Sequence, residues 1–128
     1  MYRPSTNKVI WKSEGHLHYQ HDVDIISDNE ISIFNNNTRY TKNGPKTENI
    51  DILIYDFKTN SFSRSFENTI NKIGIKTGAG GLSDFLNDGS ILMEEQAKGR
   101  LLLVNENGEL EWEYVNKSKN NKVYQLNW

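Results

Sequence analysis

Cysteine is absent from the 128-residue sequence, and proline occurs only twice. The lack of cysteine excludes disulfides and thiolate metal sites. No apolar run approaches the roughly 18 residues that a helix needs to cross a bilayer, and the first residues lack the apolar core of a signal peptide. The 15 basic residues are scattered along a chain of formal charge −2, so the basic surface typical of nucleic-acid binding is missing. We therefore expect a soluble chain that binds neither nucleic acid nor a membrane.

Short apolar runs, separated by polar residues, are what the sequence contains instead. They are rich in Ile, Leu, Val, Phe and Tyr, and hardly any stretch keeps the 3.6-residue period of a helix. This pattern predicts a nearly all-β chain. The predicted strands are Val9–Lys12, Val23–Ser27, Glu30–Asn35, Asp51–Phe57, Ser61–Glu67, Leu82–Leu86, Ser90–Glu94, Arg100–Asn105, Leu110–Val115 and Lys122–Asn127.

Residues that favour tight turns lie between several of these strands. They accept a positive φ angle at little cost, as hairpin turns require. The predicted hairpin turns are Asp28-Asn29, Thr59-Asn60, Asp88-Gly89 and Asn107-Gly108. Two further segments, Lys42–Lys46 and the glycine-rich Thr77–Gly81, are predicted to be loops.

Two hairpins repeat each other along the chain. DIISDNEISIF (24 to 34) aligns with DFLNDGSILME (84 to 94), so that Asp24 matches Asp84 and Ile31 matches Ile91. Downstream, residues 52–66 resemble residues 101–114 in the same way. A repeat of about 50 to 60 residues with four short antiparallel strands is typical of a β-propeller blade. A β-sandwich or a small barrel is the alternative, but neither requires an internal repeat.

The repeat predicts one partial propeller domain over residues 1–128. Residues 1–15 would be the trailing strand of a preceding blade, 16–68 and 69–117 two blades, and 118–128 the opening strand of the next. A propeller needs at least four blades to close a ring. We therefore expect a carboxy-terminal or internal piece of a longer protein, or copies that self-associate to cover the open blades.

Two segments carry a resemblance to a known family. YQHDVDIISDNEISIFNNN and GGLSDFLNDGSILMEEQAKGRLLLVNENGELEWEYVN are similar, in content and order, to strands and hairpins of arylsulfotransferase-like propellers. The resemblance covers about Val9 to Trp128. It implies an all-β protein with four-stranded antiparallel blades, of which this chain supplies about two, with flanking strands, out of six. It also suggests an exported, periplasmic protein, although this sequence shows no signal peptide.

The activity implied by the resemblance is sulfuryl transfer. The family moves the group from a phenolic sulfate ester to a phenol through a histidine nucleophile, with no nucleotide donor. Aryl sulfate and phenol would be the small-molecule partners, and neither a cofactor nor a metal is expected. The isolated fragment is expected to be inactive. The alternative is a propeller that performs no catalysis and serves as a binding or structural module, because propellers host both kinds of function.

The Gln-His-Asp motif of the resemblance supplies the candidate catalytic residues, His21 and Asp22. A neutral imidazole is nucleophilic at neutral pH and forms an adduct that breaks readily. Asp22 could orient the ring of His21. The alternative is a structural pair at the start of a strand. In the repeat, Gly81 takes the place of His21, so a blade does not need this histidine to fold.

Candidate substrate-binding residues are Asn35, Asn36 and Arg100, which could donate hydrogen bonds to sulfate oxygens. The asparagines could equally form a turn, and the arginine could be a solvated surface residue. One carboxylate of Glu94 and Glu95 is expected to face the channel, where it would repel sulfate unless it acts as a base toward the acceptor hydroxyl.

Two other groups of residues have ordinary structural explanations. His16 and His18 share one side of an extended chain and could hold a metal with a nearby carboxylate, but exposed loop histidines are the simpler interpretation. Trp11, Trp112 and Tyr114 are expected to pack between blades.

Overall fold

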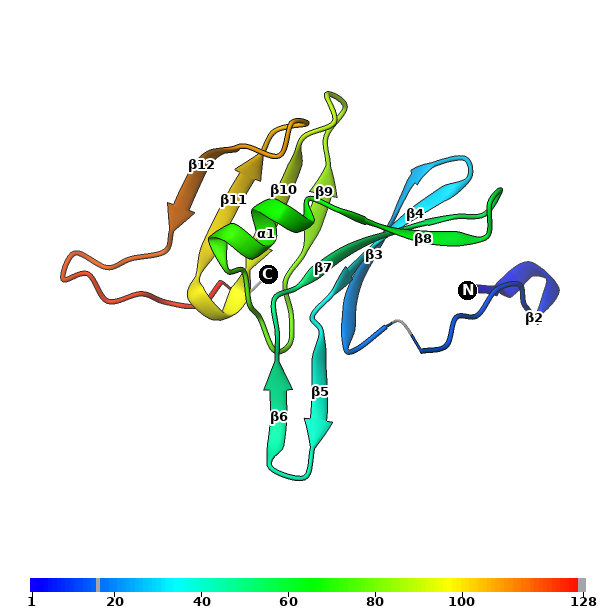
Figure 1. Cartoon of the computed structure of the whole chain (residues 1–128), viewed down its shortest axis with the longest axis horizontal. Helices are drawn as coiled ribbons and strands as arrows, with labels where there is room; N and C mark the ends of the chain where they lie inside the picture. The colour runs from blue at the N-terminus through cyan, green and yellow to red at the C-terminus, as the bar shows by residue number, and fades with distance from the viewer. Residues whose placement is uncertain (16, 127–128) are drawn as a thin grey trace.

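Two four-stranded antiparallel sheets form the body of the protein in a computed structural model, which describes residues 1–15 and 17–126 (Figure 1). The first sheet has the order β3 (Gln20–Ser27), β4 (Glu30–Asn35), β7 (Asp51–Asp56), β8 (Ser61–Ser65). The second has the order β9 (Ser83–Phe85), β10 (Ile91–Glu95), β11 (Arg100–Val104), β12 (Leu110–Val115). This confirms the all-β fold with propeller-type four-stranded blades. The described residues form two such sheets and no closed ring.

The two sheets share the register that the repeat predicts. Ile31 on β4 pairs with Ile25 and Tyr55, while Ile91 on β10 pairs with Phe85 and Val104. Three of the predicted turns contain a residue with positive φ, namely Asn60, Gly89 and Gly108. The alternating apolar pattern and the turn residues therefore act together to form the same meander twice.

Smaller elements join and flank the sheets. A short ribbon pairs β1 (Tyr2–Arg3) with β2 (Lys8–Val9) around the 3-10 helix η1 (Pro4–Thr6), and a hairpin of β5 (Thr38–Thr41) and β6 (Gly44–Thr47) projects away from both sheets (Figure 1). The helix α1 (Glu67–Ile73) follows β8, and the 3-10 helix η2 (Gln96–Lys98) follows β10. In the described part of the chain, no helix is long and apolar enough to cross a membrane.

Two of the predicted strands are wrong. Within Val9–Lys12 only Val9 belongs to a strand, because its partner is the nearby Tyr2 and residues 10–12 make no ladder. Within Lys122–Asn127, Val123 forms one isolated bridge with Lys117, and Asn127 lies outside the described residues. In the described part of the chain, residues 10–12 and 124–126 thus join no sheet.

The main hydrophobic core lies between the two sheets. Side chains of one face of the first sheet, such as Phe34 and Ile52, meet Ile91, Met93 and Leu102 of the second sheet, and all are almost completely buried. Ile70 on α1 closes this core. The helix ends at Gly74, whose φ is 70° and whose N–H donates to the Ile70 carbonyl at 2.9 Å, a conformation that glycine adopts without strain.

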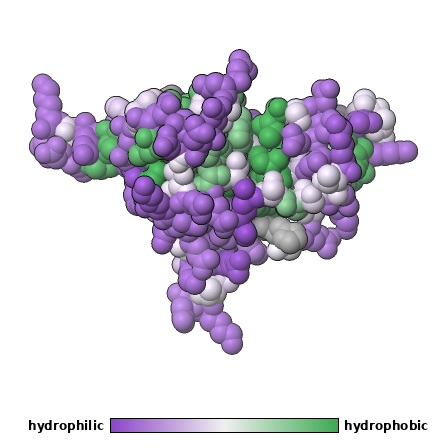
Figure 2. Space-filling view, turned by 45° about the horizontal axis from the view of Figure 1, so that its top comes forward, coloured by the Kyte–Doolittle hydropathy of each residue, from purple (hydrophilic) through white to green (hydrophobic). Residues whose placement is uncertain are grey.

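The face turned away from this core is covered on the first sheet and exposed on the second. On the first sheet, Ile33 and Tyr55 are covered by residues before β3, and the ring centroid of Trp11 lies 4.7 Å from that of Tyr55. Trp11 thus packs on a blade face, as expected. On the second sheet, Trp112 and Tyr114 are 42% and 51% exposed, so these two residues face solvent, contrary to the expectation that they pack between blades. The view in Figure 2 shows hydrophobic residues exposed between hydrophilic ones.

Candidate functional site

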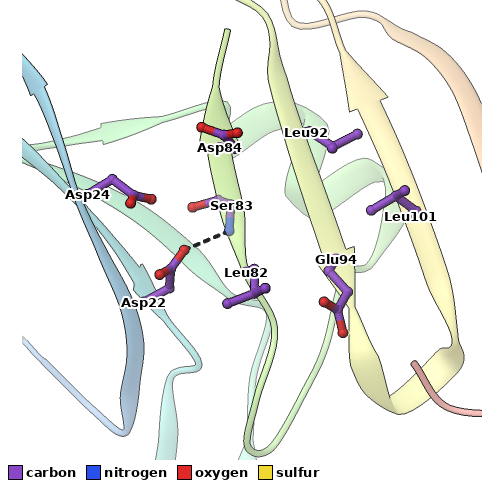
Figure 3. Close-up of a pocket in the computed structure, with 8 residues that line it drawn as sticks. All are labelled: Asp22, Asp24, Leu82, Ser83, Asp84, Leu92, Glu94 and Leu101. Atoms are coloured by element: carbon purple, nitrogen blue, oxygen red, sulfur yellow. Dashed lines mark hydrogen bonds between the residues drawn. The ribbon is translucent and has the colours of Figure 1, made fainter. Parts of the chain in front are cut away.

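The inner strands of the two sheets, β3 and β9, meet along one edge of each sheet. A carboxylate oxygen of Asp22 on β3 accepts a hydrogen bond from the backbone N–H of Ser83 on β9 at 3.0 Å, and Figure 3 shows this bond between the two ribbons. The bond satisfies a buried backbone donor at the start of β9. Asp22 therefore links the two sheets, in addition to the hydrophobic core that lies between them.

A cleft of about 470 Å³ opens beside this bond. Four carboxylates line it, two from β3 and two from the second sheet, and three leucines form its apolar wall. The carboxylates are Asp22, Asp24, Asp84 and Glu94, and the leucines are Leu82, Leu92 and Leu101. The cleft thus combines negative charge with an apolar surface, and its size is in the range of small-molecule sites.

His21 stands at a break in the pairing of β3 with β4. Gln20 pairs with Asn35 and Asp22 pairs with Phe34, so His21 has no partner across the ladder. Such β-bulges redirect side chains and are frequent beside active sites. His21 is exposed and is not among the residues that line the cleft, but its charge acts to lower the pKa of Glu94.

Glu94 is the most buried acid of the cleft, with 4% of its surface exposed. Burial raises the pKa of its carboxyl group, and the charge of His21 partly opposes this rise. The side chain has no hydrogen-bond or ion-pair partner among the described residues. Glu94 is thus a carboxylate that is easier to protonate than usual, and it lies next to a histidine.

Asp24 is also perturbed by its surroundings. Its pKa is raised by burial first, then by the charges of Asp22 and Asp84, and by a hydrogen bond with Asp22. Like charges this close disfavour each other's ionised form. The negative charges of Asp22 and Asp84 therefore both act on Asp24, and all three aspartates line the cleft.

Residues 1–117 match the family described as Arylsulfotransferase (ASST). The chain belongs to this family. No curated protein matches the chain significantly, and neither does any solved structure. The family membership confirms the resemblance of the sequence motifs.

The other predicted site residues of this arylsulfotransferase-family chain lie away from the cleft. Asn35 accepts a hydrogen bond from the backbone N–H of His18 at 2.7 Å, and Asn36 donates to the carbonyl oxygens of Thr77 and Gly80 at 3.0 and 2.7 Å. Both asparagines are almost completely buried. In this arrangement they hold loops against β4, and their role in binding substrate stays a prediction.

Arg100 lies on the face of the second sheet that is turned toward the core, opposite the face that bears Glu94. Its guanidinium group pairs with the fully buried Glu95 at 2.5 Å and with Glu113 at 2.9 Å. Glu95 also accepts from the backbone N–H of Lys76 at 2.6 Å and pairs with Lys98 at 3.2 Å. The two neighbouring acids thus differ: Glu95 is enclosed by donors, whereas Glu94 faces the cleft.

Of the two histidines before β3, the structure describes only His18. His18 is half-buried, and its backbone carbonyl accepts from Thr38 N–H at 3.2 Å, while His16 lies outside the described residues. Over residues 1–15 and 17–126, no three histidine or carboxylate side chains converge in a way that could hold a metal ion.

Asp24 and Asp84 are cleft residues that the sequence did not single out. They occupy the same position of the repeat and lie on the two inner strands, β3 and β9. Because equivalent strands of adjacent blades lie side by side, an acid that recurs at the same repeat position is a signal for a charged pair across a propeller channel. That signal was present in the sequence alignment of the two hairpins.

Proposed function

We propose that this chain is part of an enzyme that transfers a sulfuryl group from an aryl sulfate to a phenol, with His21 as the group that carries it. Two observations support the proposal: the family of the chain, and the position of His21 on a bulge beside the buried Glu94. The second is the observation on which the catalytic role of these particular residues depends.

The reaction has two steps that the residues can share. In the first, a neutral imidazole nitrogen of His21 attacks sulfur, the bond from sulfur to the phenolic oxygen breaks, and the phenolate leaves. In the second, the acceptor oxygen attacks the same sulfur, the nitrogen–sulfur bond breaks, and the acceptor proton passes to a base. Asp22 accepts a hydrogen bond from Ser83, so its contribution is to hold in place β3, the strand that carries His21.

Glu94 is suited to take the acceptor proton. Its burial raises its pKa, and a carboxylate with a raised pKa is a stronger base once it is ionised. The leucines beside it offer an apolar surface for the acceptor ring. Because the four carboxylates would repel a sulfate group inside the cleft, the donor sulfate belongs on the exposed side of His21 and the acceptor belongs in the cleft.

The test is release of nitrophenol from para-nitrophenyl sulfate in the presence of a phenol. Two sheets supply only part of a propeller, so the chain alone is expected to be inactive, and the assay uses the chain joined to the remaining blades of a family member. His21→Ala should abolish turnover, whereas His18→Ala should retain it. Absence of turnover in the joined protein, or unchanged turnover in His21→Ala, would reject the catalytic role.

A second candidate is a propeller module that binds without catalysis. It is favoured by the absence of any lysine or arginine lining the described cleft and by the engagement of Arg100 with Glu95 and Glu113. A sulfate-handling site needs donors for the negative oxygens. Binding of a phenol to the joined protein without nitrophenol release would support this second candidate.

A further inference from the structure

The charge of the cleft is one-sided. Asp22 and Asp24 extend from β3 toward β9, and Asp84 and Glu94 belong to the second sheet (Figure 3). No basic side chain lines the cleft among the described residues, although His21 lies close to Glu94. A ligand that enters this space meets negative charge from both sheets.

Glu94 is a second feature of the cleft that favours a cationic ligand. A carboxylate that is 96% buried normally has a hydrogen-bond or charged partner, because burial of an unpaired polar group costs free energy. Glu94, at 4% exposure, makes no hydrogen bond or ion pair within the described part of the chain, although the charge of His21 acts on it, and its side chain lines the cleft. Glu95, its neighbour in sequence, has three donors.

The aspartates give the same indication from the other side of the cleft. Asp24 is destabilised in its ionised form by Asp22 and Asp84. A positive charge placed between β3 and β9 would relieve this repulsion. The relief would add to the free energy with which a cation binds there.

The rest of the cleft distinguishes an organic cation from a metal ion. Hard metal ions require several oxygen ligands that converge at 2.0 to 2.6 Å, and the described residues contain no such group. The cleft volume of about 470 Å³ and the wall of Leu82, Leu92 and Leu101 instead fit a ligand with an apolar body attached to its charge.

We propose that the cleft between β3 and β9 binds a phenol that carries a cationic amine, and that such amines are the preferred acceptors of the sulfuryl group. The role as acceptor rests on the proposed function, whereas binding in the cleft does not. The ammonium group lies among Asp22, Asp24 and Asp84, and the ring lies on the leucines with its hydroxyl directed to Glu94.

Three phenols of similar size test this proposal by calorimetric titration of the chain. They are para-hydroxyphenethylamine, which is cationic, para-hydroxyphenethyl alcohol, which is neutral, and para-hydroxyphenylacetate, which is anionic. The amine should bind about tenfold more tightly than the alcohol, the effect of a partly screened charge interaction, and the anion should bind most weakly. Equal affinity for the amine and the alcohol would overturn the proposal without the use of any variant.

Variants locate the binding site. Asp24→Asn and Asp84→Asn should each reduce the preference for the amine to about threefold, because one of the coupled charges is removed. Glu111→Gln is the matched control, since Glu111 is an exposed acid of β12 outside the cleft, and it should keep the full preference. A preference that survives in both aspartate variants would place the amine elsewhere and overturn the proposal.

The two proposals fail in different ways. If the amine binds in the cleft but the joined protein does not sulfate it, the proposed reaction is rejected and the ligand class stands. If the joined protein sulfates the alcohol as efficiently as the amine, the reaction stands and the preferred cationic acceptor is rejected.

Discussion

Phe34 of the first sheet fills the space above Gly81, in the loop that leads into β9. A Cβ atom on Gly81 would lie 2.7 Å from Cζ of Phe34, and the backbone there has a φ of +90°. The repeat places Gly81 at the position of His21, so this contact leaves no room for a side chain at this position of the second repeat unit. His21, at the same position of the first unit, has an exposed side chain.

Substitution of Gly81 by alanine should destabilise the protein by about 3 kcal/mol, because the change adds both a clash with Phe34 and backbone strain. Gly15→Ala is the control for strain alone: its φ is also +90°, but an added Cβ meets no described atom within 4 Å. Urea denaturation should give a clearly smaller loss for Gly15→Ala, about 1 kcal/mol. Equal losses would mean that Phe34 can move aside.

Removal of the charge of Glu95 should cost about 3 kcal/mol, since Arg100 and Lys98 would lose a buried partner. Glu113→Gln provides the comparison, because Glu113 contacts the same arginine but is 34% exposed. Its loss should be below about 1 kcal/mol. Unfolding free energies of Glu95→Gln and Glu113→Gln that do not differ would show that the buried pair adds no stability.

The pH dependence of stability should carry the signature of Glu94. Its folded-state pKa is raised above the ordinary value of 4.5, so the folded state holds the proton longer than the unfolded state. Stability from this group is therefore full below pH 4.5 and is lost as the pH rises through the folded-state pKa. Glu94→Gln should remove this loss of stability with rising pH, and the variant should be more stable than the unmodified chain at neutral pH. Urea denaturation at a series of pH values measures both effects.

Asp88→Asn should change stability in the opposite direction to Glu94→Gln, because the pKa of Asp88 is shifted in the opposite direction. The pKa of Asp88 is lowered, first by the hydrogen bond from the Ser90 hydroxyl and then by that from the Ser90 backbone. The stability that Asp88 contributes is present above the ordinary pKa of 3.8 and is lost as the pH falls through the folded-state pKa. The variant should therefore lose stability at neutral pH, in contrast to Glu94→Gln. A gain in both variants would contradict the assignment.

The exposed face of the second sheet should make the chain self-associate. Trp112 and Tyr114 stand on it beside Leu101 and Leu103, and such apolar surface favours contact with another copy. Sedimentation should show a mass above 14.8 kDa, and Trp112→Lys should lower it. Tyr40→Lys, on the β5–β6 hairpin, is the control for loss of an exposed aromatic residue. A chain that is monomeric at all concentrations would contradict this expectation.

The sheets were predictable from sequence because their signals are local. Alternation along Glu30–Asn35, for example, and turn pairs such as Asp88-Gly89 define a meander without knowledge of the rest of the chain. The helix Glu67–Ile73 was missed because seven residues give too few turns for a 3.6-residue period. The β5–β6 hairpin was missed because Gly44-Pro45 favours a loop, whereas in the structure both residues belong to β6 and pair with Thr41 and Tyr40.

The site was less predictable because it depends on how two sheets meet. The sequence pointed to His21 through its motif, and it drew attention to Glu94 together with Glu95. It could not show that Glu94 faces the cleft and Glu95 the core, since a strand predicts alternate faces but not which one is covered. The hydrogen bond from Ser83 to Asp22 spans 61 positions of the chain, and no local pattern encodes it.

The β5–β6 hairpin offers a practical handle for studying the cleft. It projects from the sheets (Figure 1), and none of its residues lines the cleft. Because the chain contains no cysteine, one cysteine introduced at Asn43, in the exposed turn of the hairpin, would be its only thiol. A fluorophore or surface linker attached there would report ligand entry on single immobilised molecules while leaving both sheets unmodified.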